Sequence, residues 1–258
     1  MDELAKKADV IFTATPQGLC GSLVNEEILK NALEKSIQKQ IDVEYELLTI
    51  NANEHGFVSA AETLNYIGKN AKGDFLIFIH QDVILESNDV LKKIELLCKN
   101  NKFGIAGVAG CKKINEKSKT ITKIYQGMDH KKVSILRDYY LPVEVDSLDE
   151  CMLIIPKTIF NKYKFSDIGK TWHLYGTDYA LKMLIHHHAV FVFPIAIWHL
   201  SNGASLNGNY FDAMMKLAKK YENNFSEITT IYGVWPTQKR KLYWKCLYRK
   251  IRLKIKGY

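Results

Sequence analysis

Residues 75–82 read FLIFIHQD, and the expected architecture follows from this segment. Its first five residues are all apolar and show no alternation, which predicts a central strand covered on both faces. His80, Gln81 and Asp82 follow at once, and ligands of such sheets bind beyond the carboxyl ends of the strands. A carboxylate beside an imidazole there predicts a site for a divalent cation, which in turn could hold a diphosphate. Asp82 could equally end the strand and cap a turn.

Short apolar runs alternate with helix-period segments on both sides of residues 75–79. This order predicts right-handed crossovers and a mostly parallel sheet flanked by helices, which is an α/β fold. Residues 112–145 are charged and lack a sustained apolar period, so we expect loops and edge strands over the site there. We expect strands at 10–14, 43–50, 75–79, 104–109, 151–155 and 190–193, and helices at 26–37, 58–70, 88–98, 177–185 and 211–221.

The charges separate a near-neutral body from a basic C-terminal segment. The chain of 258 residues has a formal net charge of +8, but residues 239–258 hold nine Lys or Arg and no Asp or Glu. The first 238 residues therefore carry 27 basic and 28 acidic groups. A neutral body argues against a nucleic-acid-binding protein, and we expect no nucleic-acid partner. We expect one domain over residues 1–225 and a tail over 226–258.

Cysteine usage and hydropathy predict the compartment. The five cysteines are odd in number, scattered, and never form a C-x-x-C pair. They predict neither a disulfide framework nor a thiolate zinc site, and they favour a reducing compartment. The first residues lack the apolar core of a signal peptide, and no window reaches the roughly 18–20 apolar residues that cross a bilayer. We therefore expect a cytoplasmic protein.

The tail predicts a basic amphipathic helix. Tyr243, Leu247, Ile251 and Ile255 recur every four residues, with further aromatic residues beside them. Basic residues line another face, and this combination suits the interface of an anionic membrane. We therefore expect peripheral attachment to the inner face of the cytoplasmic membrane. The alternative is a C-terminal helix packed on the domain with a solvated basic face.

Two further polar groups follow later in the chain. Asp178 opens a predicted helix, where its carboxylate would cap the helix or act as a general base at the mouth of a crevice. His199 follows a predicted strand, where a lone histidine commonly has a structural role.

Taken together, these segments resemble the family-2 glycosyltransferases of GT-A fold. Residues 71–83 (AKGDFLIFIHQDV) are similar to the family segment A-x-G-[DE]-[YF]-(apolar)-F-[LI]-[DH]-x-D, in the branch where His replaces the first Asp of the D-x-D motif. Residues 61–65 resemble the helix before it, residues 145–154 the acceptor-side strand after it, and residues 175–181 (YGTDYAL) the [FY]-G-E-D-x-x-L element. The likeness covers about residues 9–203 in the family order.

The resemblance implies an enzyme that moves a hexosyl or related sugar from a nucleotide-sugar donor to a glycan or lipid-linked acceptor, as in polysaccharide biosynthesis. It implies inversion at the anomeric carbon and a divalent cation, Mn²⁺ or Mg²⁺, at Asp82 and His199 with His80 assisting. The donor contacts that it implies are Thr13, Thr15, Asn51, Asn53, Asn65, His80 and Gln81.

The same resemblance implies the acid–base residues and leaves the nucleotide open. Asp178 would be the base, while Asp149 or Glu150 would orient the acceptor. The loop at residues 15–21 is long and Gly-rich, Asn51 or Asn53 stands where the family has a base-reading Asp, and Thr177 replaces the first acid of the E-D pair. Two alternatives are a metal-dependent nucleotidyltransferase or phosphohydrolase, and an inactive GT-A-like domain that binds a sugar nucleotide or glycan.

Overall fold

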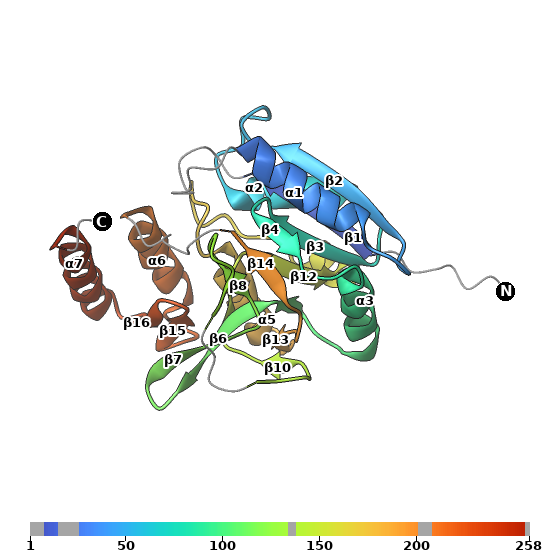
Figure 1. The fold of residues 1–258 in the computed structure, drawn as a ribbon. Coiled ribbons are helices and arrows are strands. Elements are labelled where there is room, and N and C mark those ends of the chain that lie inside the picture. Colours follow the sequence, from blue (N-terminus) through green and yellow to red (C-terminus); the bar gives the residue numbers. More distant parts are fainter. Residues whose placement is uncertain (1–7, 15–25, 134–137, 201–207, 256–258) are drawn as a thin grey trace.

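The computed structural model describes residues 8–14, 26–133, 138–200 and 208–255, and a seven-stranded sheet forms its centre (Figure 1). Across the sheet, the strands are β10 (Val143–Glu144), β13 (Val190–Val192), β5 (Ile105–Gly107), β12 (Met152–Pro156), β3 (Phe75–His80), β1 (Ala8–Ala14) and β2 (Tyr45–Asn51). Strand β12 is antiparallel to both its neighbours and β10 is antiparallel to β13, whereas the remaining pairs are parallel. Five of the seven strands therefore share one direction, as predicted for a mostly parallel sheet.

Strand β3 lies between β1 and β12 and is buried on both faces, as its uninterrupted apolar run predicts. Ile77 and Ile79 pack into one hydrophobic cluster, while Leu76 and Phe78 pack into the other. Successive side chains of a strand point to opposite faces, so one strand contributes to both halves of the core. His80 then stands at the carboxyl end of the most enclosed part of the sheet.

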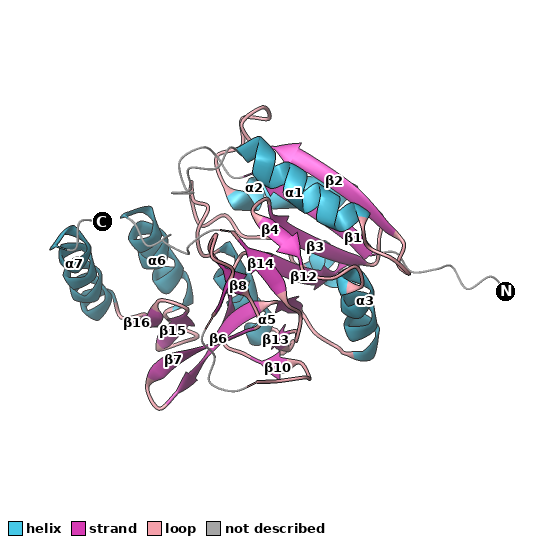
Figure 2. Ribbon diagram, in the orientation of Figure 1, coloured by secondary structure: helices cyan, strands magenta, loops and turns pink. Residues whose placement is uncertain are grey.

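Five helices cover the two faces of this sheet (Figure 2). The first cluster takes its helical side chains from α1 (Glu26–Gln38) and α3 (Val90–Asn100). The second takes them from α2 (Ala60–Asn70), α4 (Lys157–Lys162) and α5 (Tyr175–Ile185). Helix α2 begins after Ser59, whose hydroxyl accepts a hydrogen bond from the backbone N–H of Glu62, while the Glu62 carboxylate accepts one from Val58. This reciprocal arrangement satisfies donors that a helix N-terminus otherwise leaves unpaired.

Two smaller sheets lie beside the main sheet, and residues 112–145, where loops and edge strands were expected, supply part of each. One consists of β11 (Ser147–Leu148), β6 (Ala109–Ile114) and β7 (Lys117–Thr122). The other consists of β4 (Val83–Leu85), β14 (Ile197–His199), β8 (Tyr125–Gln126) and β9 (Lys131–Lys132). The strand expected at 104–109 is divided, because β5 ends at Gly107 and β6 begins at Ala109 in a different sheet.

The chain after residue 225 packs on the domain. It forms a hairpin of β15 (Glu227–Thr230) and β16 (Gly233–Pro236), followed by α7 (Lys239–Ile255), which lies beside α6 (Gly208–Tyr221) (Figure 1). Trp235, Leu242 and Cys246 are buried in one cluster with side chains of α6. The segment expected as a tail therefore packs against α6, as in the alternative given for it in the sequence analysis. Within the described parts of the chain, no helix combines the length and the apolar character needed to cross a bilayer.

Candidate metal centre and active site

Three potential metal ligands meet at the carboxyl end of β3. His80 ends β3, Asp82 lies in the turn after it, and His199 ends β14. The antiparallel pairing of β14 with β4 sets His199 opposite Val83, and the backbone N–H of Leu200 donates to the carbonyl of Asp82 over 2.8 Å. One potential ligand atom from each of the three side chains lies within 4.8 Å of the other two. The pairing of two short strands thus brings together residues that are far apart in sequence.

The three side chains and their burial determine the pKa of each group. His199 Nε2 lies 3.3 Å from Asp82 Oδ2. Burial acts to raise the pKa of Asp82, but its hydrogen bond to His199 and the charges of both histidines outweigh burial and lower the pKa to about 2. Burial has the opposite effect on His199, whose protonated form is the charged one, yet the hydrogen bond to Asp82 and the charge of Asp82 raise the pKa of His199. Burial lowers the pKa of His80, so this imidazole is biased towards the neutral form that binds metals.

This donor set fits a divalent cation. Two imidazole nitrogens and an ionised carboxylate can converge on one ion and leave positions for ligand oxygens. Mg²⁺ is held mainly by oxygen ligands, whereas imidazole suits transition-series cations. The two imidazoles therefore favour a divalent cation of the transition series over Mg²⁺.

Two acidic residues, Asp149 and Glu150, lie beside this centre in the segment just before β12. The Asp149 carboxylate accepts a hydrogen bond of 3.0 Å from the backbone N–H of Cys151, and the Cys151 carbonyl accepts one of 3.0 Å from the backbone of His80. Burial, followed by the charge of Asp149, raises the pKa of Glu150 to about 8, although the backbone N–H groups of Gly176 and Thr177 oppose the shift. Among the described residues, Glu150 Oε1 is buried without a hydrogen-bond partner.

Tyr175 connects the acidic pair to the metal centre, and our sequence analysis assigned it no role. It is the first residue of α5, and its hydroxyl lies 2.8 Å from His80 Nε2. Burial and the charges of Glu150 and Asp149 raise its pKa well above the ordinary value, so the hydroxyl stays protonated. The motif at residues 175–181 contains this tyrosine, but nothing in the motif indicates that it contacts the histidine of another segment.

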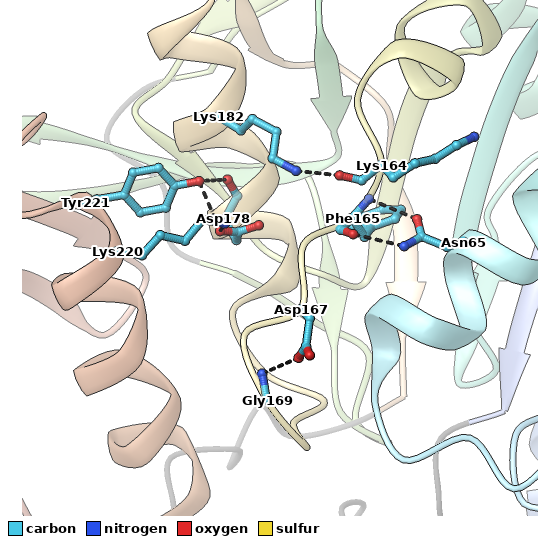
Figure 3. A network of polar contacts seen from close by, with 9 residues as sticks. All are labelled: Asn65, Lys164, Phe165, Asp167, Gly169, Asp178, Lys182, Lys220 and Tyr221. Atoms are coloured by element: carbon cyan, nitrogen blue, oxygen red, sulfur yellow. Dashed lines mark hydrogen bonds and ion pairs between the residues drawn. The ribbon is translucent and has the colours of Figure 1, made fainter.

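Asp178 points towards α6 (Figure 3). Its side chain is 1% exposed, and Oδ1 accepts hydrogen bonds from Lys220 Nζ over 2.5 Å and from the Tyr221 hydroxyl over 3.0 Å. Helix α5 begins at Tyr175 with Leu174 as N-cap, so Asp178 lies inside the first turn and does not cap the helix. Among the residues that the structure describes, the structure leaves Asp178 Oδ2 buried without a hydrogen-bond partner.

The ends of β1 and β2 lie at the same edge of the sheet as the metal centre. Thr13 pairs in register with His80, and Ala14 pairs with Asn51. The Asn51 side chain accepts a hydrogen bond from the backbone of Asn53 and donates one to Glu54, which shapes the turn after β2. Gln81 is buried in the turn after β3, while Thr15 and the Gly-rich loop of residues 15–21 lie outside the described residues.

The side chain of Asn65 on α2 contacts a loop. Its amide nitrogen donates to the Phe165 carbonyl and its amide oxygen accepts from the Phe165 backbone, both over 2.9 Å (Figure 3). Both polar groups of the amide are thus used to hold residue 165 against α2. The donor contact of Asn65 stays a prediction, whereas this contact with Phe165 could not be predicted, because the local pattern on α2 carries no information about the distant loop that it meets.

The comparison with protein families identifies the chain. Residues 22–228 match the model of a glycosyltransferase-like family. The chain belongs to this glycosyltransferase-like family, which is related to family 2. The sequence-based prediction of a family-2-like glycosyltransferase is therefore confirmed.

Solved structures of glycosyltransferases share the fold at low sequence identity. Residues 1–349 of TarS from S. aureus are 12% identical with a TM-score of 0.53, over 84% of this chain and 66% of that one. The mannosyltransferase PcManGT from Pyrobaculum calidifontis, in complex with GDP-Man and Mn²⁺, is 10% identical with a TM-score of 0.50. The match covers 84% of this chain and 62% of that one. GalNAc-T7, in a structure with UDP, GalNAc and Mn²⁺, is 12% identical with a TM-score of 0.52. The match covers 81% of this chain and 45% of that one. These likenesses confirm the GT-A fold.

Two curated relatives match only short stretches. The N-acetyl-gamma-glutamyl-phosphate reductase of Lachnospira eligens is 35% identical over 91 residues, which cover 35% of this chain and 24% of that protein. The reductase of the same name from Lachnoclostridium phytofermentans is 66% identical over 29 residues, or 11% of this chain and 8% of that protein. The chain spans about a quarter of the first protein and less than a tenth of the second, so no reductase activity follows for it.

Proposed function

We propose that this protein transfers a hexosyl or related sugar from a nucleotide-sugar donor to a hydroxyl of a glycan or lipid-linked glycan, with inversion at the anomeric carbon. The observation that carries the proposal is the convergence of His80, Asp82 and His199 at the carboxyl end of β3. That edge is where α/β sheets bind ligands, and the solved relatives of this fold include complexes with UDP, UDP-GlcNAc and GDP-Man.

In this proposal the three side chains hold a divalent cation, which neutralises charge on the leaving diphosphate. Asp82 supplies the negative charge, and its low pKa keeps it ionised across the physiological range. Tyr175 orients His80 through its hydroxyl, which fixes the direction of one ring nitrogen. Thr13, Asn51 and Asn53 at the ends of β1 and β2 are proposed to contact the donor nucleotide, with Gln81 beside them.

Two carboxylates are candidates for the proton acceptor. Asp178 occupies the position that the family motif gives to the base, but its Oδ1 accepts hydrogen bonds from Lys220 and Tyr221 on α6. Glu150 lies next to Tyr175, and both Glu150 Oε1 and Asp178 Oδ2 are buried without a hydrogen-bond partner among the described residues. The two carboxyl groups differ because Asp178 is already paired with the Lys220 ammonium. An acceptor hydroxyl can donate to such an oxygen without breaking an existing bond. We therefore assign proton acceptance first to the ionised form of Glu150, whose population rises as the pH approaches 8, and second to Asp178, and we assign orientation of the acceptor to Asp149.

The deciding experiment measures nucleotide release from a panel of nucleotide sugars with Mn²⁺ or Mg²⁺, with and without an acceptor. Release that requires the acceptor supports glycosyl transfer. Equal release without an acceptor would indicate a phosphohydrolase or nucleotidyltransferase that uses the same carboxylates. Binding without release would indicate an inactive sugar-nucleotide-binding domain. A thermal-shift screen chooses the donor, because a ligand at 100 times its Kd stabilises the folded state by about 2.7 kcal/mol.

The acceptor class determines where the reaction takes place. We propose that the enzyme works in the cytoplasm and, when its acceptor is lipid-linked, at the inner face of the cytoplasmic membrane. The basic charge of the C-terminal segment supports this location.

A further inference from the structure

One side of α7 is fixed to the domain. Leu242 and Cys246 are buried in the cluster shared with α6, and Trp235 of the hairpin lies in the same cluster. On the same side, Lys245 donates to the carbonyl of Val234 and Arg249 donates to the carbonyl of Tyr232. These contacts fix the rotation of the helix about its own axis, so the structure determines which side chains point outward.

The outward side of α7 carries a row of large apolar side chains. Trp244, Tyr248, Ile251 and Ile255 are 61%, 59%, 49% and 79% exposed. At 100° per residue, these four positions lie within roughly 60° of one another, and the centre of the row lies about 170° from the buried side. We call these four residues the outer row. It differs from the row expected from sequence, because Leu247 is half-buried and Tyr243 lies to one side.

Basic side chains flank the outer row. Arg240, Lys241 and Arg252 are exposed, and the Arg252 guanidinium lies 5.7 Å from the centroid of the Tyr248 ring. Residues 239–258 contain no acidic residue. We propose that α7 docks this domain on an anionic lipid bilayer, with the outer row inserted at the headgroup level and the flanking arginine and lysine side chains on the lipid phosphates.

Charge and composition favour a bilayer over a second copy of this chain. Two copies meeting through their outer rows would bring Arg240, Lys241 and Arg252 of each against those of the other, with no acidic residue of α7 to offset the repulsion. Tryptophan and tyrosine are enriched at membrane interfaces, and a helix of this length, about 25 Å, can lie flat on the surface. The outer row is thus arranged as the apolar side of an interfacial helix that the domain holds in a fixed orientation.

The test compares binding of the full-length chain to phosphatidylcholine vesicles with and without phosphatidylglycerol, by co-sedimentation. We expect binding to the anionic vesicles that weakens as salt is raised, since the Debye length is about 10 Å at 0.1 M. The double variant Trp244→Ser/Ile251→Ser should bind about tenfold more weakly or worse, because apolar area is lost from the bilayer contact. A matched control is Leu96→Ser/Leu141→Ser, which removes exposed apolar side chains elsewhere and should bind like the wild type.

A second double variant, Arg240→Gln/Lys241→Gln, tests the role of the basic side chains. It should bind anionic vesicles more weakly, and its binding should depend less on salt. All substituted side chains are exposed, so the melting temperatures of the variants should match the wild type. Vesicle binding is read without turnover, so it stands or falls separately from glycosyl transfer. Equal binding by the wild type and the outer-row variant would overturn the proposal. Dimerisation without vesicles that the outer-row variant abolishes would also overturn it, in favour of a second copy.

Discussion

Replacing Glu150 by glutamine tests the proposed base and the electrostatics of the site together. The pKa of Glu150 is raised from an ordinary value of 4.5 to about 8 by burial and by the charge of Asp149. Between pH 4.5 and about pH 8, the Glu150 carboxyl is ionised in the unfolded chain but keeps its proton in the folded chain. The free energy of unfolding of the wild type therefore falls as the pH rises. A pKa shift of this size corresponds to a change of roughly 5 kcal/mol in the free energy of unfolding. Because the Glu150 side chain is partly exposed and solvent screens its charge, we expect a change of about 2–3 kcal/mol.

Glu150→Gln removes this ionisation while keeping the shape of the side chain. We expect the variant to be about 2–3 kcal/mol more stable than the wild type above pH 8, with the difference shrinking towards zero near pH 4.5. Its turnover should fall about 10²–10⁴-fold, the range for loss of a general base. The measurements are denaturant unfolding across this pH range and acceptor-dependent nucleotide release. Glu144→Gln, at an exposed glutamate of β10, is the matched control and should change neither quantity.

Two results would refute the reasoning. Full turnover of Glu150→Gln would show that another group accepts the proton, with Asp178 the next candidate. A stability difference that does not change with pH would show that the Glu150 carboxyl is not held in the buried, proton-retaining environment described above. The two readouts are independent, so the catalytic role can fail while the electrostatic description survives.

Three further predictions concern the residues around this site. Asp178→Asn should lower the free energy of unfolding by about 1–3 kcal/mol, measured by denaturant unfolding, because it leaves Lys220 without its anionic partner. Its turnover should stay within a few-fold of the wild type. A fall in turnover of about 10²-fold or more at unchanged stability would make Asp178 the base. Asp82→Asn should weaken Mn²⁺ binding in calorimetry, and wild-type binding should weaken as the pH falls and His199, whose pKa is raised, takes up a proton. Asn65→Ala should lower the free energy of unfolding by about 1–3 kcal/mol in denaturant unfolding, because it removes two hydrogen bonds to Phe165, and its donor affinity tests the predicted donor contact.

Much of the architecture could be predicted because its causes are local. The apolar run before His80 indicates a strand buried on both faces, and β3 is such a strand. Ser59 and Glu62 mark the start of a helix by contacts within four residues, which any chain with that spacing can form. The exact extent of elements was harder to predict, as the division of 104–109 into β5 and β6 shows, because the chain changes sheet there.

The contacts of the candidate site depended on the tertiary structure. Sequence alone indicated that His80 and Asp82 follow a buried strand, but the position of His199 beside Asp82 depends on the pairing of β14 with β4. The role of Tyr175 and the contact of Asp178 with Lys220 were likewise set by how α5 packs against β3 and α6. Each of these contacts joins segments far apart in the chain, and no local period encodes such a distance.

The last helix separates the two kinds of information most clearly. Its basic charge and its helical period are properties of consecutive residues, so the sequence by itself determined that a basic helix ends the described chain. Which side of that helix is buried was decided by Leu242 and Cys246 packing against α6 and by the hairpin carbonyls that hold Lys245 and Arg249. Helix α7 carries apolar residues on more than one side, and only the shape of the surface that it packs against determines which side is buried.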